Sequence, residues 1–526
     1  MSLIRAVLPK SDEELARMLN ELQLGEFIYE QPALGDTEYI FKHALTQQVS
    51  YNSVLQERRR QLHERIGAAI EALYAKSIED HLDELAHHYS RSGNMPKALE
   101  YHERVGRQAL QRSAYTDAMR ALTAAIELLM RMPESPERDR REFGLQTALG
   151  PVLMIQGWAA PETERVYLRA QKLAETGGTA AQRFSLLVGL FSTAYVGGRF
   201  PEARDRLEQT RSFTSQQPEP EFLLELTHHD WSIALSTGEL ETAQRHVEDG
   251  LAFYQAHPGS VPVTPYSAHH PAVCGHAWGA IIFWLRGYPE RARRHADQAV
   301  SLAHEVGHSP SVIFALSHKA NVHQIAREVR PALEAAEAAI TIAEKEGVPL
   351  FESWARVAKG WALSHLGQAE QGVAQIREAL AMASATIGEI WRTYNLAQLA
   401  EACGKAERID EGLEVIVEAL DVVQEKGERW WEAEIHRLKG ELLLKQDDHN
   451  TVEAQICFER AIEIAHRQSA KSLELRATTS LARLLDKTER RDEARTMLAA
   501  ICNWFTEGLD TSDLIDAKAL LDELGK

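Results

Sequence analysis

Residues 352–382, ESWARVAKGWALSHLGQAEQGVAQIREALAM, contain one complete structural unit. A helix-favouring segment ends at Gly367, and a second helical segment follows it. In the second segment, Gly372, Ile376 and Ala379 recur at the spacing that places side chains on one face of a helix. The stretch therefore predicts a helix–turn–helix unit whose second helix buries one stripe of small and apolar residues.

The same stripe occurs again along most of the chain at a nearly constant distance. Successive copies begin 40, 49, 40, 40, 40, 42 and 40 residues apart. Because no unit can bury its apolar face alone, neighbouring units must stack into an array. The small residues that begin each stripe are Ala203, Ala243, Ala292, Ala332, Gly372, Gly412, Ala454 and Ala494.

Composition and charge narrow the function classes. The chain has 526 residues, of which 44% are hydrophobic and 26% charged, and its net charge is −19. An acidic surface repels phosphate backbones, so we expect no nucleic-acid partner. The four cysteines form no CxxC pair, and no apolar run is long enough to span a membrane. These features favour a cytoplasmic protein without disulfides and without a membrane partner.

Two sets of segments resemble known families. Residues 85–105, LAHHYSRSGNMPKALEYHERV, resemble a tetratricopeptide repeat (TPR). The segments RLKGELLL (437–444), CFERAIEIAHRQSAKSLELRATTSLARLL (457–485) and WFTEGLDTSDLIDAKALLDEL (504–524) resemble the closing repeats of a bacterial family of signalling proteins. Members of that family join an adenylate/guanylate cyclase domain or a DNA-binding domain to a STAND-type ATPase and then to TPR arrays.

The resemblance implies an all-α fold for most of the chain. We expect residues 77–526 to form a TPR-like, right-handed α-α superhelix, a solenoid. Proline-rich or polar stretches predict loop insertions in it near 131–140, 215–221 and 256–272.

The N-terminal segment is expected to be different. Residues 25–74, GEFIYEQPALGDTEYIFKHALTQQVSYNSVLQERRRQLHERIGAAIEALY, look like the junction where the ATPase module of that family ends. Residues 1–76 are therefore expected to be a winged-helix-like remnant followed by a linker helix over 54–73. The resemblance places His43 where a family histidine contacts nucleotide phosphates, whereas the alternative is a packed histidine at a helix start.

We expect this chain to bind no cofactor and to catalyse no reaction. No GxxxxGK[ST] motif occurs, so ATP or ADP could bind only with an upstream ATPase domain that this sequence lacks. His269, His270, Cys274 and His276 cluster in the inserted loop, but a proline-rich loop is a poor preformed metal site. ExxH pairs such as Glu225–His228 lie in units that do not meet in a solenoid, so we expect no metal.

The concave surface is the predicted partner site. In TPR arrays the first helix of each unit lines this surface, and its inward positions here carry six aromatic residues. Exposed Trp and Tyr beside Asn, Gln and Arg are typical of a binding face, whereas the alternative is that the tryptophans fill gaps between repeats. The predicted groove residues are His228, His229, Trp278, Trp284, His318, Asn321, Trp354, Trp361, His365, Trp391, Tyr394, Asn395, Gln398 and Arg437.

These features predict a non-catalytic sensor and protein-interaction arm that regulates a STAND-type ATPase signalling protein. Its partners would be a protein or peptide in the groove and an ATPase, cyclase or transcription module in cis or in trans. Two alternatives remain. The chain could be the C-terminal part of an adenylate/guanylate cyclase with an ATP-binding domain, or it could be a free-standing TPR scaffold.

Overall fold

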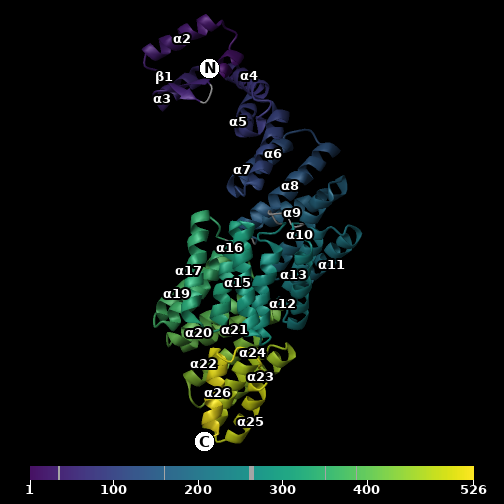
Figure 1. Cartoon of the computed structure of the whole chain (residues 1–526), viewed down its shortest axis with the longest axis vertical. Coiled ribbons are helices and arrows are strands. Elements are labelled where there is room, and N and C mark those ends of the chain that lie inside the picture. Colours follow the sequence, from purple (N-terminus) through teal and green to yellow (C-terminus); the bar gives the residue numbers. More distant parts are fainter. Residues whose placement is uncertain (34–35, 159, 260–265, 350, 387, 526) are drawn as a thin grey trace. The chain divides into compact units, whose positions relative to one another are not determined.

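The computed structural model describes residues 1–33, 36–158, 160–259, 266–349, 351–386 and 388–525. Almost all of its regular elements are helices (Figure 1), and the described residues contain one two-stranded sheet. The chain divides into two compact units, Met1–Leu149 and Gly150–Lys526. Each unit is described separately below.

The first unit begins with a β-hairpin between short helices. Strands β1 and β2 pair antiparallel, with Ile28 opposite Phe41. The elements are α1 (Ser2–Val7), α2 (Asp12–Leu24), β1 (Ile28–Ala33), β2 (Asp36–Phe41), α3 (Ala44–Ser53), α4 (Gln56–Leu73), η1 (Ile78–His81), α5 (Leu82–Ser92), α6 (Met95–Gln111) and α7 (Tyr115–Met130). Helix α8 (Pro136–Gln156) continues from this unit into the second.

Helix α4 agrees with the helix predicted over 54–73. Its buried residues are His63, Gly67, Ala69 and Ile70. Helix α4 packs against α5, and the Tyr89 ring covers Gly67. A Cβ on Gly67 would approach this ring to 2.8 Å, so the close contact depends on glycine.

Helices α5 and α6 form the helix pair that the TPR-like stretch predicts. Leu85, Tyr89, Ala98 and Tyr101 lie in one buried cluster. Gly93 ends α5 with a φ of +90°, a conformation that glycine adopts without strain. The pair is therefore closed by a left-handed turn and an apolar interface.

The second unit is a series of antiparallel helix pairs. In each pair an inner helix is followed by an outer helix, and inner helices also pack against one another. The elements are α9 (Pro161–Leu173), η2 (Ala174–Thr176), α10 (Ala180–Val196), α11 (Phe200–Gln216), α12 (Pro220–Ser236), α13 (Leu240–Ala256), α14 (Pro271–Leu285), α15 (Pro289–Val306), α16 (Ser309–Ile325), α17 (Val329–Glu346), α18 (Glu352–His365), α19 (Ala369–Thr386), α20 (Arg392–Lys405), α21 (Ile409–Lys426), α22 (Glu432–Gln446), α23 (Thr451–Arg467), α24 (Lys471–Lys487), α25 (Arg491–Cys502) and α26 (Ser512–Leu524).

The predicted stripe is confirmed in every pair. Each of the eight stripe-opening residues lies three positions after the first residue of an outer helix, and all eight are buried. Small side chains here let the two helices of a pair approach closely, as Gly360 and Gly372 show: a Cβ on either would lie within 3 Å of the other's carbonyl oxygen. The expected fold class, an all-α TPR-like superhelix with a small N-terminal segment, is confirmed.

The expected insertions lie at breaks between helices. Helix α7 ends at Met130 and α8 begins at Pro136, so the break is shorter than the expected 131–140; α11 ends at Gln216 and α12 begins at Pro220. The longest connection follows α13, which ends at Ala256, and precedes α14, which begins at Pro271. Pro262 and Pro265, expected in this insertion, lie outside the described residues.

Among the contacts that close the second unit onto itself, four end on carbonyls of inner helices, and we call these four the clasp contacts. A helix end leaves its last carbonyls without partners inside the helix. In four successive inner helices, α10, α12, α14 and α16, such a carbonyl accepts a hydrogen bond from a residue four or five helix pairs further along the chain. The contacts join Glu389 N–H to Val196 C=O (2.8 Å), Arg429 N–H to Ser236 C=O (2.8 Å), Ser472 O–H to Trp284 C=O (2.5 Å) and the Arg476 guanidinium to Ile325 C=O.

Candidate functional site

The predicted groove residues of the second unit share one inner face. The Trp354 and Trp391 rings stack with centroids 5.2 Å apart, and Trp278 lies 5.9 Å from Trp391. His318 contacts both Trp354 and Trp391 edge to face, with each pair of centroids 5.1 Å apart. These four predicted groove residues therefore lie together.

The rings are buried, which agrees with the alternative that the tryptophans fill gaps between repeats and not with an exposed face. Of the fourteen residues, all except His365 and Arg437 are buried, and Trp391 has no exposed surface. The clasp contacts bring inner helices from distant pairs together, so the aromatic side chains fill the space between them. The residues of this face thus form a core, and their role in binding a partner stays a prediction.

Burial also determines the charge of the inner histidine. His318 is 1% exposed, and burial lowers its pKa to about 3. Its Nδ1 lies 2.9 Å from the Phe314 carbonyl oxygen, to which a neutral imidazole donates. His318 is therefore a neutral packing group at physiological pH.

A cavity of about 260 Å³ opens where the aromatic core ends, and we call it the charged cavity. It lies between the inner helices α16, α18, α20, α22 and α24 and helix α26. Three predicted groove residues, Trp361, Gln398 and Arg437, line it. Its charged lining residues are Arg327, Lys405, Arg437, Lys445, Arg476, Arg483, Glu401, Glu434, Glu441, Asp513 and Asp516.

Ion pairs hold the inner wall of the charged cavity in place. The Arg437 guanidinium donates two hydrogen bonds to Glu434, of 2.8 and 3.0 Å. Arg476 donates to Asp513 over 2.8 Å and reaches Ile325 in the fourth clasp contact. Fork-shaped pairs of this kind fix the orientation of both partners, so the wall is preorganised.

Glu401 supplies a fixed negative charge within this wall. It accepts a hydrogen bond of 2.9 Å from Trp361 Nε1 and lies 3.4 Å from His365 Nε2. Burial alone would raise the pKa of Glu401, but its hydrogen bond with His365, the charges of His365 and Arg437, and the Trp361 donor lower it to about 2. The carboxylate is therefore ionised at physiological pH.

The rim of the charged cavity carries basic side chains. Lys405 and Arg483 are exposed, and within the described part of the chain neither forms an ion pair. A second hollow of about 520 Å³ shares Glu441, Lys445, Ser480 and Arg483 with the charged cavity and adds the charged residues Lys487, Asp447 and Asp448. The shared residues show that the two hollows adjoin one another along α22 and α24.

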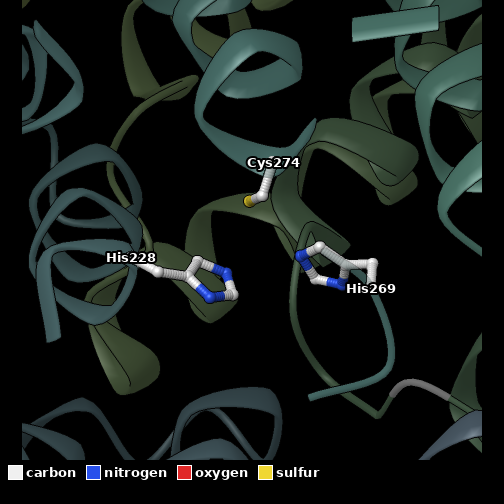
Figure 2. A group of neighbouring side chains, drawn as sticks. All are labelled: His228, His269 and Cys274. Carbon is white, nitrogen blue, oxygen red and sulfur yellow. The ribbon is translucent and has the colours of Figure 1, made fainter. Parts of the chain in front are cut away.

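Of the four residues expected in the inserted loop, Cys274 and His276 lie instead in α14, whose N-cap is His270, and the four side chains separate in space. His269 and Cys274 lie together with His228 of α12 (Figure 2). His276 faces away and pairs with His295, with their Nδ1 atoms 3.2 Å apart. His270 donates its backbone N–H to Ser311 Oγ over 2.8 Å.

His43, the expected nucleotide sensor, lies at the N-terminus of α3. It is exposed and its side chain does not cap the helix. The alternative of a packed histidine is therefore wrong, whereas the contact with phosphate stays a prediction.

Several residues of the charged cavity were not predicted. Arg476, Arg483 and Asp513 belong to the last helices, where the groove positions were not extended in the sequence. Glu401 and Glu434 lie one helical turn from the predicted Gln398 and Arg437, and this spacing was the signal that could have identified them.

The described part of the chain has no helix with enough length and apolar character to cross a membrane. No family model matches the sequence. An uncharacterized protein of Rhizobium meliloti (strain 1021) is 26% identical over 488 residues, which is 92% of this chain and 47% of the relative. The chain therefore spans about half the length of the curated relative it matches.

Solved structures share the helical fold at low sequence identity. Cut9 in the APC/C hetero-tetramer Cut9–Hcn1 is 14% identical, with 92% of this chain and 86% of that chain covered and a TM-score of 0.49. A Rap protein complexed with competence and sporulation factor is 10% identical, with 65% and 98% covered and a TM-score of 0.43. Yeast Tom70 is 13% identical, with 92% and 96% covered and a TM-score of 0.33. These likenesses concern the fold alone.

Proposed function

We propose that this chain is a cytoplasmic, non-catalytic interaction arm of a STAND-type ATPase signalling protein. In this proposal the arm binds a protein or peptide segment in the charged cavity and thereby biases the state of the ATPase. The observation that carries the proposal is the charged cavity itself, a preorganised opening on the inner helices where the aromatic core ends. A ligand shifts the ATPase only if it binds one state of the arm more tightly than the other.

The basic side chains at the rim indicate the charge of the proposed ligand. Lys405, Lys445, Arg483 and Lys487 surround the opening, while most acidic side chains of the cavity are engaged in ion pairs with its inner arginines. Unpaired basic groups attract acidic side chains or a terminal carboxylate. The proposed ligand is therefore an extended segment that carries negative charge.

The N-terminal segment supports a second contact, with the ATPase. Helix α3 has no buried residue, and Leu45 and Val49 on it are 70% and 61% exposed. Phe27 and Leu55 nearby in the sequence are 49% and 80% exposed. An apolar surface of this kind marks a contact with another protein part, and it lies in the segment that resembles the ATPase junction.

Charge reversal at the rim should weaken ligand binding. Acidic peptides selected on the immobilised full chain are expected to bind the variant Lys405→Glu/Arg483→Glu about tenfold or more weakly, with a smaller salt dependence. Fluorescence anisotropy at two ionic strengths measures both effects. The matched control Lys345→Glu/Arg495→Glu changes the same net charge at exposed positions outside the cavity. Equal losses in the two variants would show that net charge, and not the cavity, attracts the peptide.

The contact with the ATPase can be tested by photo-crosslinking in the native cells. A crosslinking amino acid at Val49 is expected to capture a polypeptide segment that contains a P-loop, in the same or in a separate chain. The control is the same amino acid at Ile456, which is 59% exposed in the repeat array. Crosslinks from Val49 only to proteins without a P-loop would contradict the regulatory role and favour a free-standing scaffold.

A further inference from the structure

Three potential metal ligands converge at one buried point of the second unit. His228 comes from α12, His269 precedes α14 and Cys274 lies in the first turn of α14 (Figure 2). One ligand atom of each residue lies within 4.8 Å of the other two. The three residues are 6%, 2% and 0% exposed, so they share a site closed to bulk water.

The polar atoms of the His269 ring are buried. Neither ring nitrogen has a hydrogen-bond partner among the described residues, and both are buried. The ring is held by stacking on Phe314, with centroids 4.0 Å apart and planes 8° from parallel. A buried polar group without a partner is destabilising, and coordination of a metal ion would supply the missing interaction.

Glu225 orients His228 in the way that metal-binding histidines require. Its Oε1 lies 3.1 Å from His228 Nδ1, and because a carboxylate only accepts, the Nδ1–H donates. The other ring nitrogen, Nε2, then carries the lone pair that can bind a metal. A carboxylate behind a histidine ligand fixes its tautomer and increases its basicity.

The space beside the two histidines is large enough for one water molecule. A cavity of about 20 Å³ adjoins His228 and His269, and Ser232 and Ser267 also border it, whereas Cys274 does not line it. A volume of this size holds a single water. The site therefore offers two imidazoles, one thiol and room for a fourth, oxygen ligand, which together match the tetrahedral preference of zinc.

We propose that His228, His269 and Cys274 bind one zinc ion, with Glu225 as the group that orients His228 and a water molecule as the fourth ligand. The charges balance, because the Cys274 thiolate and the Glu225 carboxylate compensate a divalent cation in a buried place. The ion connects the end of the long insertion to α12 and α14. Imidazole and thiolate together favour zinc over magnesium or calcium, which prefer oxygen ligands.

In the metal-free alternative a proton on the His228 ring occupies the place of the ion, between Cys274 and Glu225. Burial lowers the pKa of His228, but the charge and hydrogen bonds of Cys274 and Glu225 outweigh burial and raise this pKa to about 10. Zinc would replace that proton, so its binding releases protons and weakens in acid. The two arrangements differ in their response to cobalt, which adopts the same geometry as zinc and absorbs visible light.

The test uses the full chain without an affinity tag that binds metals. After removal of metals, titration with Co²⁺ is expected to produce a thiolate-to-cobalt band in the near ultraviolet and strong visible bands of a tetrahedral site, saturating at one ion per chain. Competition by Zn²⁺ should abolish both bands. If the folded wild-type chain gives no thiolate-to-cobalt band, the proposal is overturned, and this result requires no variant.

Variants then assign the ligands. Cys274→Ser is expected to abolish the thiolate-to-cobalt band, and Glu225→Gln should weaken metal affinity by about 10–100-fold. Cys457→Ser, at a buried cysteine of α23, is the matched control and should leave the spectrum unchanged. A band that persists in Cys274→Ser would place the metal elsewhere and overturn the assignment.

Discussion

Replacing Trp354 with alanine is expected to lower the free energy of unfolding of the second unit by about 3–5 kcal/mol. Trp354 is 1% exposed, and its ring contacts Phe351, His318 and Trp391 with centroid distances of 5.5, 5.1 and 5.2 Å. Removing it leaves a cavity that the inner helices cannot fill, because the clasp contacts hold them in place. Urea denaturation followed by circular dichroism measures the loss.

The matched control is Trp504→Ala. This ring is 36% exposed and contacts Tyr288 and Phe505, so its removal should cost about 1 kcal/mol. The opposite pattern, a fully stable Trp354→Ala protein that loses its partner, would mean that the inner face is an open groove as the sequence indicated.

Replacing Glu428 with alanine is expected to lower the free energy of unfolding by about 2–4 kcal/mol at pH 7. The Glu428 carboxylate accepts hydrogen bonds from Thr393 N–H (2.8 Å), Thr393 O–H (2.7 Å) and Trp391 N–H. Glu428 lies in the connection between α21 and α22, and from there it caps the N-terminus of α20. It also holds Trp391, a non-glycine residue with a φ of +63°, in a left-handed conformation that is otherwise unfavourable.

The same carboxyl group makes stability depend on pH. Burial raises the pKa of Glu428 from 4.5 to about 7, although the three donors oppose this shift. The folded state therefore binds the proton more tightly, so this contribution to stability is full below about pH 4.5 and is lost as pH rises through about 7. Glu428→Gln should remove this dependence, as urea denaturation at several pH values would show.

A suitable control for both effects is Glu425→Ala, at an exposed position of α21. It should change stability by less than about 0.5 kcal/mol. A Glu428→Ala protein as stable as this control would show that water satisfies the three donors and that the cap is not structural.

The sequence predicted the local structure of the array in detail. The spacing of small residues such as Ala203 and Ala494 identified the start of each outer helix, because close packing within a pair favours Ala or Gly at that position. The repeat period and the turn residues can be identified from short stretches of sequence, without knowledge of how distant helices pack. The same reasoning grouped Trp278, Trp354 and Trp391 on one face.

The exposure of that face was not predictable, because it depends on the pitch of the superhelix. Small rotations between successive pairs add up along the array, and they decide whether Glu389 reaches Val196 or remains far from it. The clasp contacts join residues 151–193 positions apart, and no pattern in the sequence marks them. The aromatic residues therefore looked like a binding face, although they form a core.

The proximity of His228, His269 and Cys274 was likewise not predicted from the sequence. His269 and Cys274 stood out because they are close in sequence, and Glu225 and His228 stood out as an ExxH pair. The expectation that distant units do not meet kept the two groups apart. Helices α12 and α14 are in fact neighbouring inner helices, and their contact brings the two groups together.

The central claim is that the second unit closes onto itself through the clasp contacts, which bury the inner face. Hydrogen–deuterium exchange at the amides of Glu389 and Arg429 tests it most directly, because both lie between helices and both donate to carbonyls of distant inner helices. The account predicts that these amides exchange as slowly as the amides in the middle of α20. Exchange as fast as that of His449, an exposed residue between α22 and α23, would contradict it and show that the inner face is open in solution.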